Sequence, residues 1–409
     1  MKDPLERSTI SGRKVLFVTT VVALLVTVWA IIQPQLVGTI VLILSLPTII
    51  MLHEAGHYVM AKRGGMKVTE FFVGFGPRIW SVKRGETEYG VKAILLGGYV
   101  RIIGMNNLDH VEPEDEPRAY RNRPFRNRIE VAVAGSAVHF LLALILIFVL
   151  LVSIGTLSDT TSVGAVSDGS PAEAAGLQDD DVIVAIDDVP VTEFEDLRDY
   201  VRPRPEQEMV LTVERDGEEL HVPVTPELKT DNGEEVGLIG VAPGFETTRV
   251  AALPAVKETF VVFGRTARMS TEALGRIFSP SGIANYVDTV FSGGEGDEGE
   301  QSQERFVSPL GFGRLANQAV DDGWLAVLGL LVSINVFVGI FNLIPLLPFD
   351  GGHVAIACYE QIASKIKGRR VQADVAKLLP ITSAVMVLLG FIFISSLFLD
   401  ASNPLQNPF

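Results

Sequence analysis

Long apolar stretches constrain this chain more than any other feature of its sequence. A helix needs about 20 consecutive apolar residues to cross a bilayer, and five stretches are close to that length or longer. They lie at residues 15–32, 36–60, 131–154, 324–347 and 379–399. Because 48% of all residues are hydrophobic as well, we predict a polytopic α-helical membrane protein with about five spans.

The stretch at residues 15–32 could instead be the apolar region of a signal peptide. It is longer than the usual length of about 7–15 residues, and the Gln-Pro-Gln that follows it contains no Ala-x-Ala cleavage site. We therefore interpret it as an additional transmembrane helix.

Charge is distributed unevenly around the apolar stretches. Basic residues gather in the N-terminus, in residues 62–128 and in residues 365–377, and the positive-inside rule places all three in the cytoplasm. The acidic region at residues 159–322 then lies outside the cell membrane. A net charge of −15 argues against nucleic acid as a partner, since phosphate binding needs clustered basic residues. We expect membrane proteins and membrane lipid as partners instead.

Two regions between the spans have patterns of their own. Residues 68–105 combine β-branched and aromatic residues with spaced glycines, which predicts short hairpins that associate with the membrane. Residues 160–228 contain short β-type runs and a helix signal at residues 193–201, which predicts an inserted extracytoplasmic α+β domain. Residues 254–277 have the periodicity of a helix on the membrane surface, and residues 292–304 have the composition of a flexible acidic linker.

These patterns divide the chain into nine predicted segments. In order they are 1–35 (N-terminus and extra transmembrane helix), 36–62 (transmembrane helix), 63–128 (β segment and basic loop), 129–155 (transmembrane helix), 160–228 (outer domain), 229–323 (surface helix and linker), 324–352 (transmembrane helix), 353–378 (cytoplasmic segment) and 379–409 (C-terminal transmembrane helix).

A metal-binding pattern lies near the end of the second apolar stretch. His53, Glu54 and His57 form the sequence His-Glu-x-x-His, which on a helix places both imidazoles on one face and the glutamate beside a metal-bound water. Two histidines and a glutamate in an apolar helix are costly unless they are paired or bind metal. The pattern therefore predicts a hydrolytic zinc site, with Glu54 as the general base. A polar cluster that packs two helices together is the alternative interpretation.

Catalytic zinc needs a third protein ligand and an open position for water. The single cysteine, Cys358, excludes an intrachain disulfide and a cysteine-rich site. Asp350 follows the fourth apolar stretch, between Pro345 and Pro348 on one side and a glycine pair on the other. Backbone that is broken in this way lines protected cavities in membrane proteins, so we predict that Asp350 is the third ligand.

The same residues carry a resemblance to a known family. His53 to His57, followed far downstream by Asn342 to Gly352, resemble the site-2 protease family of intramembrane zinc metalloproteases. The bacterial branch that contains the regulator of sigma-E protease is the most similar. Residues 74–77, 87–89 and 96–100 resemble the membrane-associated β segment of that family. Residues 169–183 resemble a PDZ domain.

The resemblance implies a function and further site residues. It implies that Zn²⁺ is bound by His53, His57 and Asp350, that Glu54 and Asn342 are catalytic, and that single-pass transmembrane proteins are the substrates. Pre-cleaved anti-sigma factors or remnant signal peptides are the substrates it suggests, with the active site near the cytoplasmic side and a trimmed substrate terminus as the PDZ ligand. The β segment implies that substrate binds beside Gly97, Gly98 and Tyr99.

Two histidines near these motifs are assigned other roles. His139 stands where the family often has asparagine, and we interpret it as a polar residue that packs helices together. His353 lies one turn beyond Asp350 and is interpreted as a structural residue or a partner of a ligand.

Two interpretations from other functional classes remain open at this point. The chain could be an inactive membrane scaffold with a PDZ domain, or a membrane protein that transports or senses zinc. Zinc content measured together with proteolysis separates all three, because the scaffold has neither and the transporter has metal without cleavage.

Overall fold

The computed structural model describes residues 34–105, 108–153, 155–167, 169–231, 234–248, 251–291, 306–321 and 323–402. The chain divides into two compact units. One comprises the residues up to Ile147 together with those from Phe260 onward, and the other is Phe148–Thr259.

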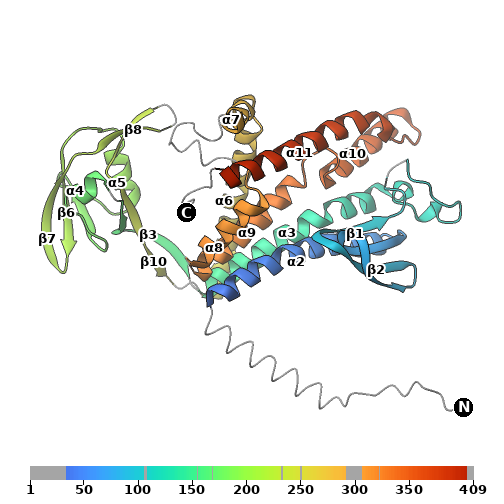
Figure 1. Ribbon diagram of the computed structural model, residues 1–409, viewed down its shortest axis with the longest axis horizontal. Coiled ribbons are helices and arrows are strands. Elements are labelled where there is room, and N and C mark those ends of the chain that lie inside the picture. Colours follow the sequence, from blue (N-terminus) through green and yellow to red (C-terminus); the bar gives the residue numbers. More distant parts are fainter. Residues whose placement is uncertain are drawn as a thin grey trace, which may run out of the picture. The chain divides into compact units, whose positions relative to one another are not determined.

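Four described helices are long and apolar enough to cross a membrane (Figure 1). They are α2 (Pro34–Arg63), α3 (Phe125–Ser153), α9 (Trp324–Phe341) and α11 (Leu379–Ser402). Helices suit a bilayer because they satisfy their backbone polar groups internally. These helices match four of the five predicted spans, while the remaining one, residues 15–32, lies outside the described residues.

The fourth span is shorter than the sequence indicated. Helix α9 ends at Phe341 instead of residue 347, and a series of turns leads to α10 (Asp350–Lys367). Pro345 and Pro348 explain the early end, since proline cannot donate a helical hydrogen bond. Asp350 is therefore the first residue of a new helix, which occupies much of the predicted cytoplasmic segment.

The predicted β segment is present as two long antiparallel strands, β1 (Val68–Arg84) and β2 (Thr87–Ile102). Phe72 of β1 pairs with Tyr99 on one side and with Gly90 on the other, and Gly90 pairs in turn with Ser81. The two strands therefore bend and pair more than once, so that the sheet has more than two rows of backbone. Residues 98–102 of β2 form one outer row of this sheet. Short 3-10 helices η1 (Glu116–Arg118) and η2 (Tyr120–Asn122) follow the sheet.

Glycine is required at the centre of this sheet. A Cβ on Gly90 would lie 2.4 Å from the carbonyl oxygen of Trp80 and 2.5 Å from Cε1 of Phe72. Real Cβ atoms do not approach other atoms so closely, so only glycine allows three rows of backbone to meet at this point.

A charged cluster fixes the β1–β2 turn to the end of α2. Hydrogen bonds from Arg118 and from Lys62 of α2 lower the pKa of Glu86 to about 2, although its partial burial acts in the opposite direction. Beside this cluster, Met66, Val68 and Tyr120 are among the buried residues of a small core that also includes the first turns of α3. The sheet is thereby held against the helix that carries the zinc motif.

The unit Phe148–Thr259 is built around an antiparallel sheet with the strand order β10-β3-β4-β6-β7, and β5 pairs with β4. Its elements are β3 (Thr156–Val166), α4 (Pro171–Ala174), β4 (Val182–Ile186), β5 (Val189–Pro190), α5 (Phe194–Val201), β6 (Met209–Arg215), β7 (Glu218–Val224), β8 (Glu227–Asp231), β9 (Glu234–Leu238) and β10 (Val241–Thr248). Helix α5 confirms the predicted helix at residues 193–201. Because β10 pairs with β3, the sheet extends beyond the predicted boundaries of 160–228.

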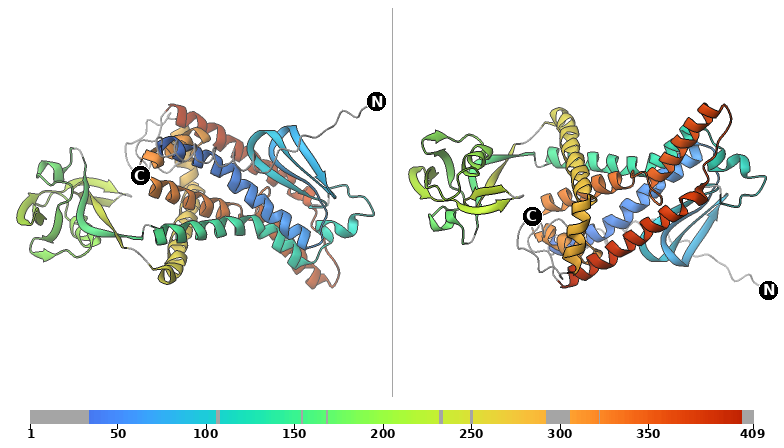
Figure 2. Two further views of the ribbon diagram at one scale, coloured as in Figure 1. Left: turned by 90° about the horizontal axis from the view of Figure 1, so that it is seen from below. Right: turned by 90° about the horizontal axis from the view of Figure 1, so that it is seen from above.

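The remaining helices follow this unit in the sequence. They are α6 (Ala252–Ile277), α7 (Pro280–Phe291), α8 (Pro309–Asp321) and the short 3-10 helix η4 (Val375–Leu378). Helix α6 confirms the predicted helix at residues 254–277, and it runs crosswise to the long helices (Figure 2). The predicted linker at residues 292–304 lies outside the described residues. Helices α2, α8 and α9 pack together through a core that includes Leu42, Ala319 and Leu331.

Candidate metal centre

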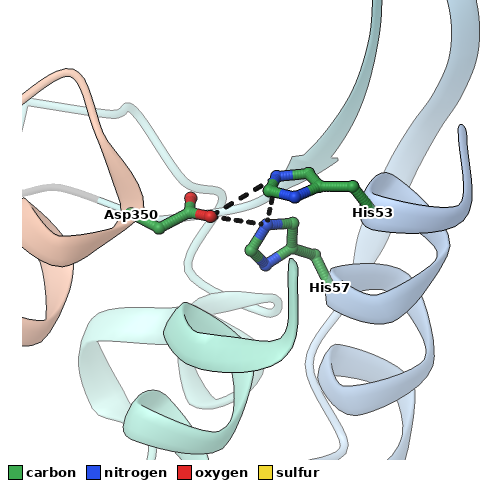
Figure 3. Close-up of side chains that lie close together, drawn as sticks. All are labelled: His53, His57 and Asp350. Atoms are coloured by element: carbon green, nitrogen blue, oxygen red, sulfur yellow. Dashed lines mark hydrogen bonds and ion pairs between the residues drawn. The ribbon is translucent and has the colours of Figure 1, made fainter. Parts of the chain in front are cut away.

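Three side chains from two helices converge beside α3. His53 and His57 lie on successive turns of α2, and Asp350 is the first residue of α10 (Figure 3). The Nε2 atoms of the two histidines are 3.2 Å apart. Oδ2 of Asp350 lies 3.1 Å from Nε2 of His57 and 3.4 Å from Nε2 of His53. The predicted ligand set is therefore brought together by the fold.

The spacing of these three atoms suits a tetrahedral zinc ion. Zinc binds imidazole nitrogen and carboxylate oxygen at about 2.0–2.1 Å, so neighbouring tetrahedral ligands lie about 3.3 Å apart. The separations of 3.1, 3.2 and 3.4 Å are close to that value. Two histidines and one carboxylate also leave the fourth position open, as in catalytic zinc sites. In the described ranges this is the one group of three His, Cys, Asp or Glu residues whose ligand atoms lie within 4.8 Å of one another.

Helix α3 holds both imidazoles in place. Nδ1 of His57 donates a hydrogen bond of 2.7 Å to the carbonyl oxygen of Val131, which leaves Nε2 without a proton and available to a metal. The ring of His53 lies against Gly135, where a Cβ would be 2.2 Å from Cε1 of the imidazole. Both contacts come from one side of α3.

Gly135→Ala is expected to weaken zinc binding by about 10–100-fold, because its methyl group would displace the His53 imidazole. Zinc affinity of the purified protein, measured by competition with a chromophoric chelator, checks this expectation. Gly329→Ala in α9 is the matched control, since a Cβ there meets no atom within 4 Å. Wild-type affinity in Gly135→Ala would show that His53 does not depend on this contact.

The turns between α9 and α10 bring Gly351, the residue after Asp350, back to the backbone of Asn342. The N–H of Gly351 donates a hydrogen bond of 2.8 Å to the carbonyl oxygen of Asn342. A Cβ on Gly351 would lie 2.2 Å from the carbonyl oxygen of Leu343. Glycine at this position therefore allows the two ends of the turn to approach closely, as the glycine pair in the sequence indicated.

Glu54 lies between α2 and the end of β2. A Cβ on Gly98 would be 3.5 Å from Cγ of Glu54 and 3.1 Å from Sδ of Met51. The residue next to the predicted metal ligand His53 is thus also next to the outer row of the sheet.

The other predicted β-segment residues differ in what they contact. Gly97 is buried against the ring of Phe75. The ring of Tyr99 stacks on Phe72 at 5.7 Å, and its hydroxyl group donates a hydrogen bond to Glu70. The side chain of Tyr99 is therefore occupied within the sheet, and any contact with a substrate would come from its backbone.

His139 and His353 lie close to the centre without joining the ligand set. Nδ1 of His139 lies 3.1 Å from Oδ1 of Asn335 on α9, and its ring is 5.0 Å from that of His53. His353 makes an edge contact of 6.2 Å with the ring of Tyr120. The partner of His139 on α9 was not predicted, although Asn335 is a polar residue in an apolar span and could have been noticed for that reason.

The sequence of this chain is also similar to those of known proteins. A sequence model described as "Peptidase family M50" matches residues 41–389. "Zinc metalloprotease Rip1" of Mycobacterium tuberculosis is 32% identical over 405 residues, which cover 90% of this chain and 98% of that protein. The protein of the same name in Mycolicibacterium smegmatis is 33% identical over 411 residues, with the same coverage. "Metalloprotease MmpA" of Caulobacter vibrioides is 30% identical over 364 residues, which cover 81% of this chain and 89% of that protein.

Among solved structures, the PDZ domain of an SdrC-like protein from Listeria monocytogenes matches 21% of this chain and 87% of its own length, with 21% identity and a TM-score of 0.19. This score does not establish a PDZ fold, so the PDZ assignment stays a prediction. The family match covers most of the chain and includes both parts of the metal centre. The chain therefore belongs to peptidase family M50, the site-2 protease family, and is a zinc metalloprotease.

Proposed function

We propose that this protease hydrolyses peptide bonds within the transmembrane segments of other membrane proteins. In this proposal His53, His57 and Asp350 hold the zinc ion, and Glu54 is the general base. The observation that supports it most is the convergence of the three ligand atoms at tetrahedral spacing, two of them from α2, a helix long and apolar enough to cross a membrane. A hydrolytic site in such a helix is suited to substrates that are themselves within the membrane.

Zinc at this site supplies Lewis acidity toward a water and a peptide carbonyl. Glu54 takes a proton from the attacking water and later donates it to the leaving amine. His57 is held by Val131 and His53 by Gly135, so neither ring needs to reorient during the reaction. The backbone of Asn342 adjoins Gly351, the residue after Asp350, and we assign Asn342 a contact with the substrate carbonyl or with the anion that forms from it.

The outer row of β2 is proposed to bind the substrate as an added strand. A peptide bond inside a helix is not accessible, so the substrate must unwind before it is cut. Residues 98–102 pair with β1 on one side, and the row adjoins Glu54 through Gly98. An extended substrate that pairs with this row would meet the general base directly.

Topology and substrates are part of the same proposal. The positive-inside rule places the metal centre toward the cytoplasm and the unit Phe148–Thr259 outside. We propose that this outer unit is a PDZ domain that binds the new terminus of a substrate trimmed by an earlier protease. Pre-cleaved anti-sigma factors and remnant signal peptides have the required form, a single span with little or no outer domain.

Cleavage of a single-pass substrate by the purified full-length protein tests this function. The substrate is offered with its outer domain intact and with that domain removed, and the products are located by mass spectrometry. The trimmed form is expected to be cut at least about tenfold faster, within its transmembrane segment, and 1,10-phenanthroline should abolish cleavage by removing zinc.

Two outcomes would contradict the proposal. Cleavage confined to water-exposed loops would show an ordinary surface protease. Equal rates for intact and trimmed substrates would contradict the part of the proposal in which the outer unit selects trimmed proteins. They would not contradict cleavage within the membrane.

A further inference from the structure

One face of α3 contacts both histidines of the metal centre. Arg128, Val131 and Gly135 follow one another at helical spacing of three and four residues, so their side chains or carbonyls lie along one stripe. Val131 binds His57, and Gly135 lies against His53. The two ligands from α2 are therefore both fixed by this stripe. The third ligand, Asp350, belongs to a different helix and needs a connection of its own.

Arg128 supplies a connection to α10. Its Nη1 donates a hydrogen bond of 2.6 Å to Oε2 of Glu360. Arg128 is 8% exposed and Glu360 is 9% exposed, so this is a buried ion pair between the first turn of α3 and the middle of α10. Surface ion pairs contribute little to stability, but removing one partner of a buried pair leaves the other charge buried without compensation.

Both partners are also fixed by other groups. The Arg128 guanidinium lies over the ring of Tyr120 at 5.2 Å, and the Tyr120 hydroxyl donates a hydrogen bond of 3.1 Å to the carbonyl oxygen of Arg128. Oε1 of Glu360 accepts a hydrogen bond of 2.6 Å from the N–H of Ala373. The same Tyr120 ring meets His353, one turn after Asp350. The ion pair thus sits in a fixed setting and not between two mobile side chains.

Asp350 and Glu360 are the first and eleventh residues of the same helix, about 15 Å apart along its axis. A helix of this length moves as a rod, so fixing the side chain of Glu360 sets both the rotation and the axial position of Asp350. We propose that Arg128 and Glu360 are positioning residues for the third metal ligand. This proposal rests on the ligand assignment made under Proposed function.

Cobalt(II) binding to the full-length protein in detergent, followed by visible absorption, tests the proposal without relying on cleavage. Arg128→Gln and Glu360→Gln are each expected to weaken cobalt affinity by about tenfold or more and to change the intensity of the absorption bands. Arg128→Lys keeps the positive charge and should remain within about threefold of the wild type. Melting of the cobalt-free proteins shows whether each variant is folded.

Two further variants separate this proposal from the ligand assignment. Asp115→Asn breaks another partly buried ion pair, with Lys67, and it should bind cobalt as the wild type does. Asp350→Asn should lose cobalt, and if it does not, the ligand assignment itself is wrong. If Asp350→Asn loses cobalt while folded Arg128→Gln and Glu360→Gln bind it normally, the positioning role is wrong.

If a glutamine variant does not fold, a more conservative variant provides a second test. Glu360→Asp keeps the charge but withdraws the carboxylate by one methylene group, so an intermediate loss of cobalt affinity is expected. Wild-type affinity in that variant would overturn the proposal.

Discussion

Glu54→Gln is expected to lower the cleavage rate by about 10²–10⁴-fold while leaving zinc bound, because the amide cannot accept the proton of the attacking water. The amide has nearly the shape of the carboxylate, and Glu54 is not one of the three converging ligands. Zinc content should therefore stay at one per protein, as in the wild type. Rates are measured on a trimmed single-pass substrate, and zinc by mass spectrometry of the same preparation.

Glu130→Gln is the control for this change. Glu130 is partly exposed on α3 and forms an ion pair with Arg126, so its substitution should alter neither rate nor zinc content. A Glu54→Gln protein that holds zinc and cuts at the wild-type rate would mean that another group takes the proton.

Asp350→Asn is expected to remove zinc and, with it, cleavage. Both imidazoles are neutral, so Asp350 is the one negatively charged ligand, and the amide of asparagine lacks that charge. The loss of zinc affinity should therefore exceed the cost of about 10–100-fold found for residues that only support a ligand. Zinc remaining after dialysis and cleavage of the trimmed substrate are the two measurements. Loss of zinc without unfolding distinguishes a ligand from a structural residue.

Asp374→Asn provides the matched control. Asp374 accepts a hydrogen bond of 3.2 Å from the N–H of Ala376 at the start of η4, away from the converging ligands. It should keep both zinc and activity. An Asp350→Asn protein with one zinc per chain and normal cleavage would exclude Asp350 as a ligand.

The sequence predicted the members of the metal cluster because each is marked locally. His53 and His57 stand four residues apart in an apolar helix, and the cost of burying them there indicates a metal. Asp350 is marked by the prolines before it and the glycines after it. The structure brings these three together, as expected, although it begins a new helix at Asp350.

The supporting contacts could not be predicted in the same way. Arg128 and Glu360 are separated by 232 positions, and His139 and Asn335 by 196. Arg128 and Glu360 look ordinary in their own segments. His139 and Asn335 stand out as polar residues in apolar spans, but no spacing rule joins two helices so far apart in the chain. The doubled rows of β1 and β2 were hidden for a related reason, since Phe72 pairs on both sides and alternation alone does not choose its partners.

The stiffness of helix α3 also matters for the metal centre. The carbonyl group of Val131 holds His57, Gly135 faces His53, and Arg128 pairs with Glu360, and all three residues belong to this one helix. A helix resists twisting because every turn is closed by hydrogen bonds. A rotation of α3 about its own axis would therefore shift the contacts of His53, His57 and Glu360 together. One small turn of this helix would thus disturb the positions of all three proposed zinc ligands at once.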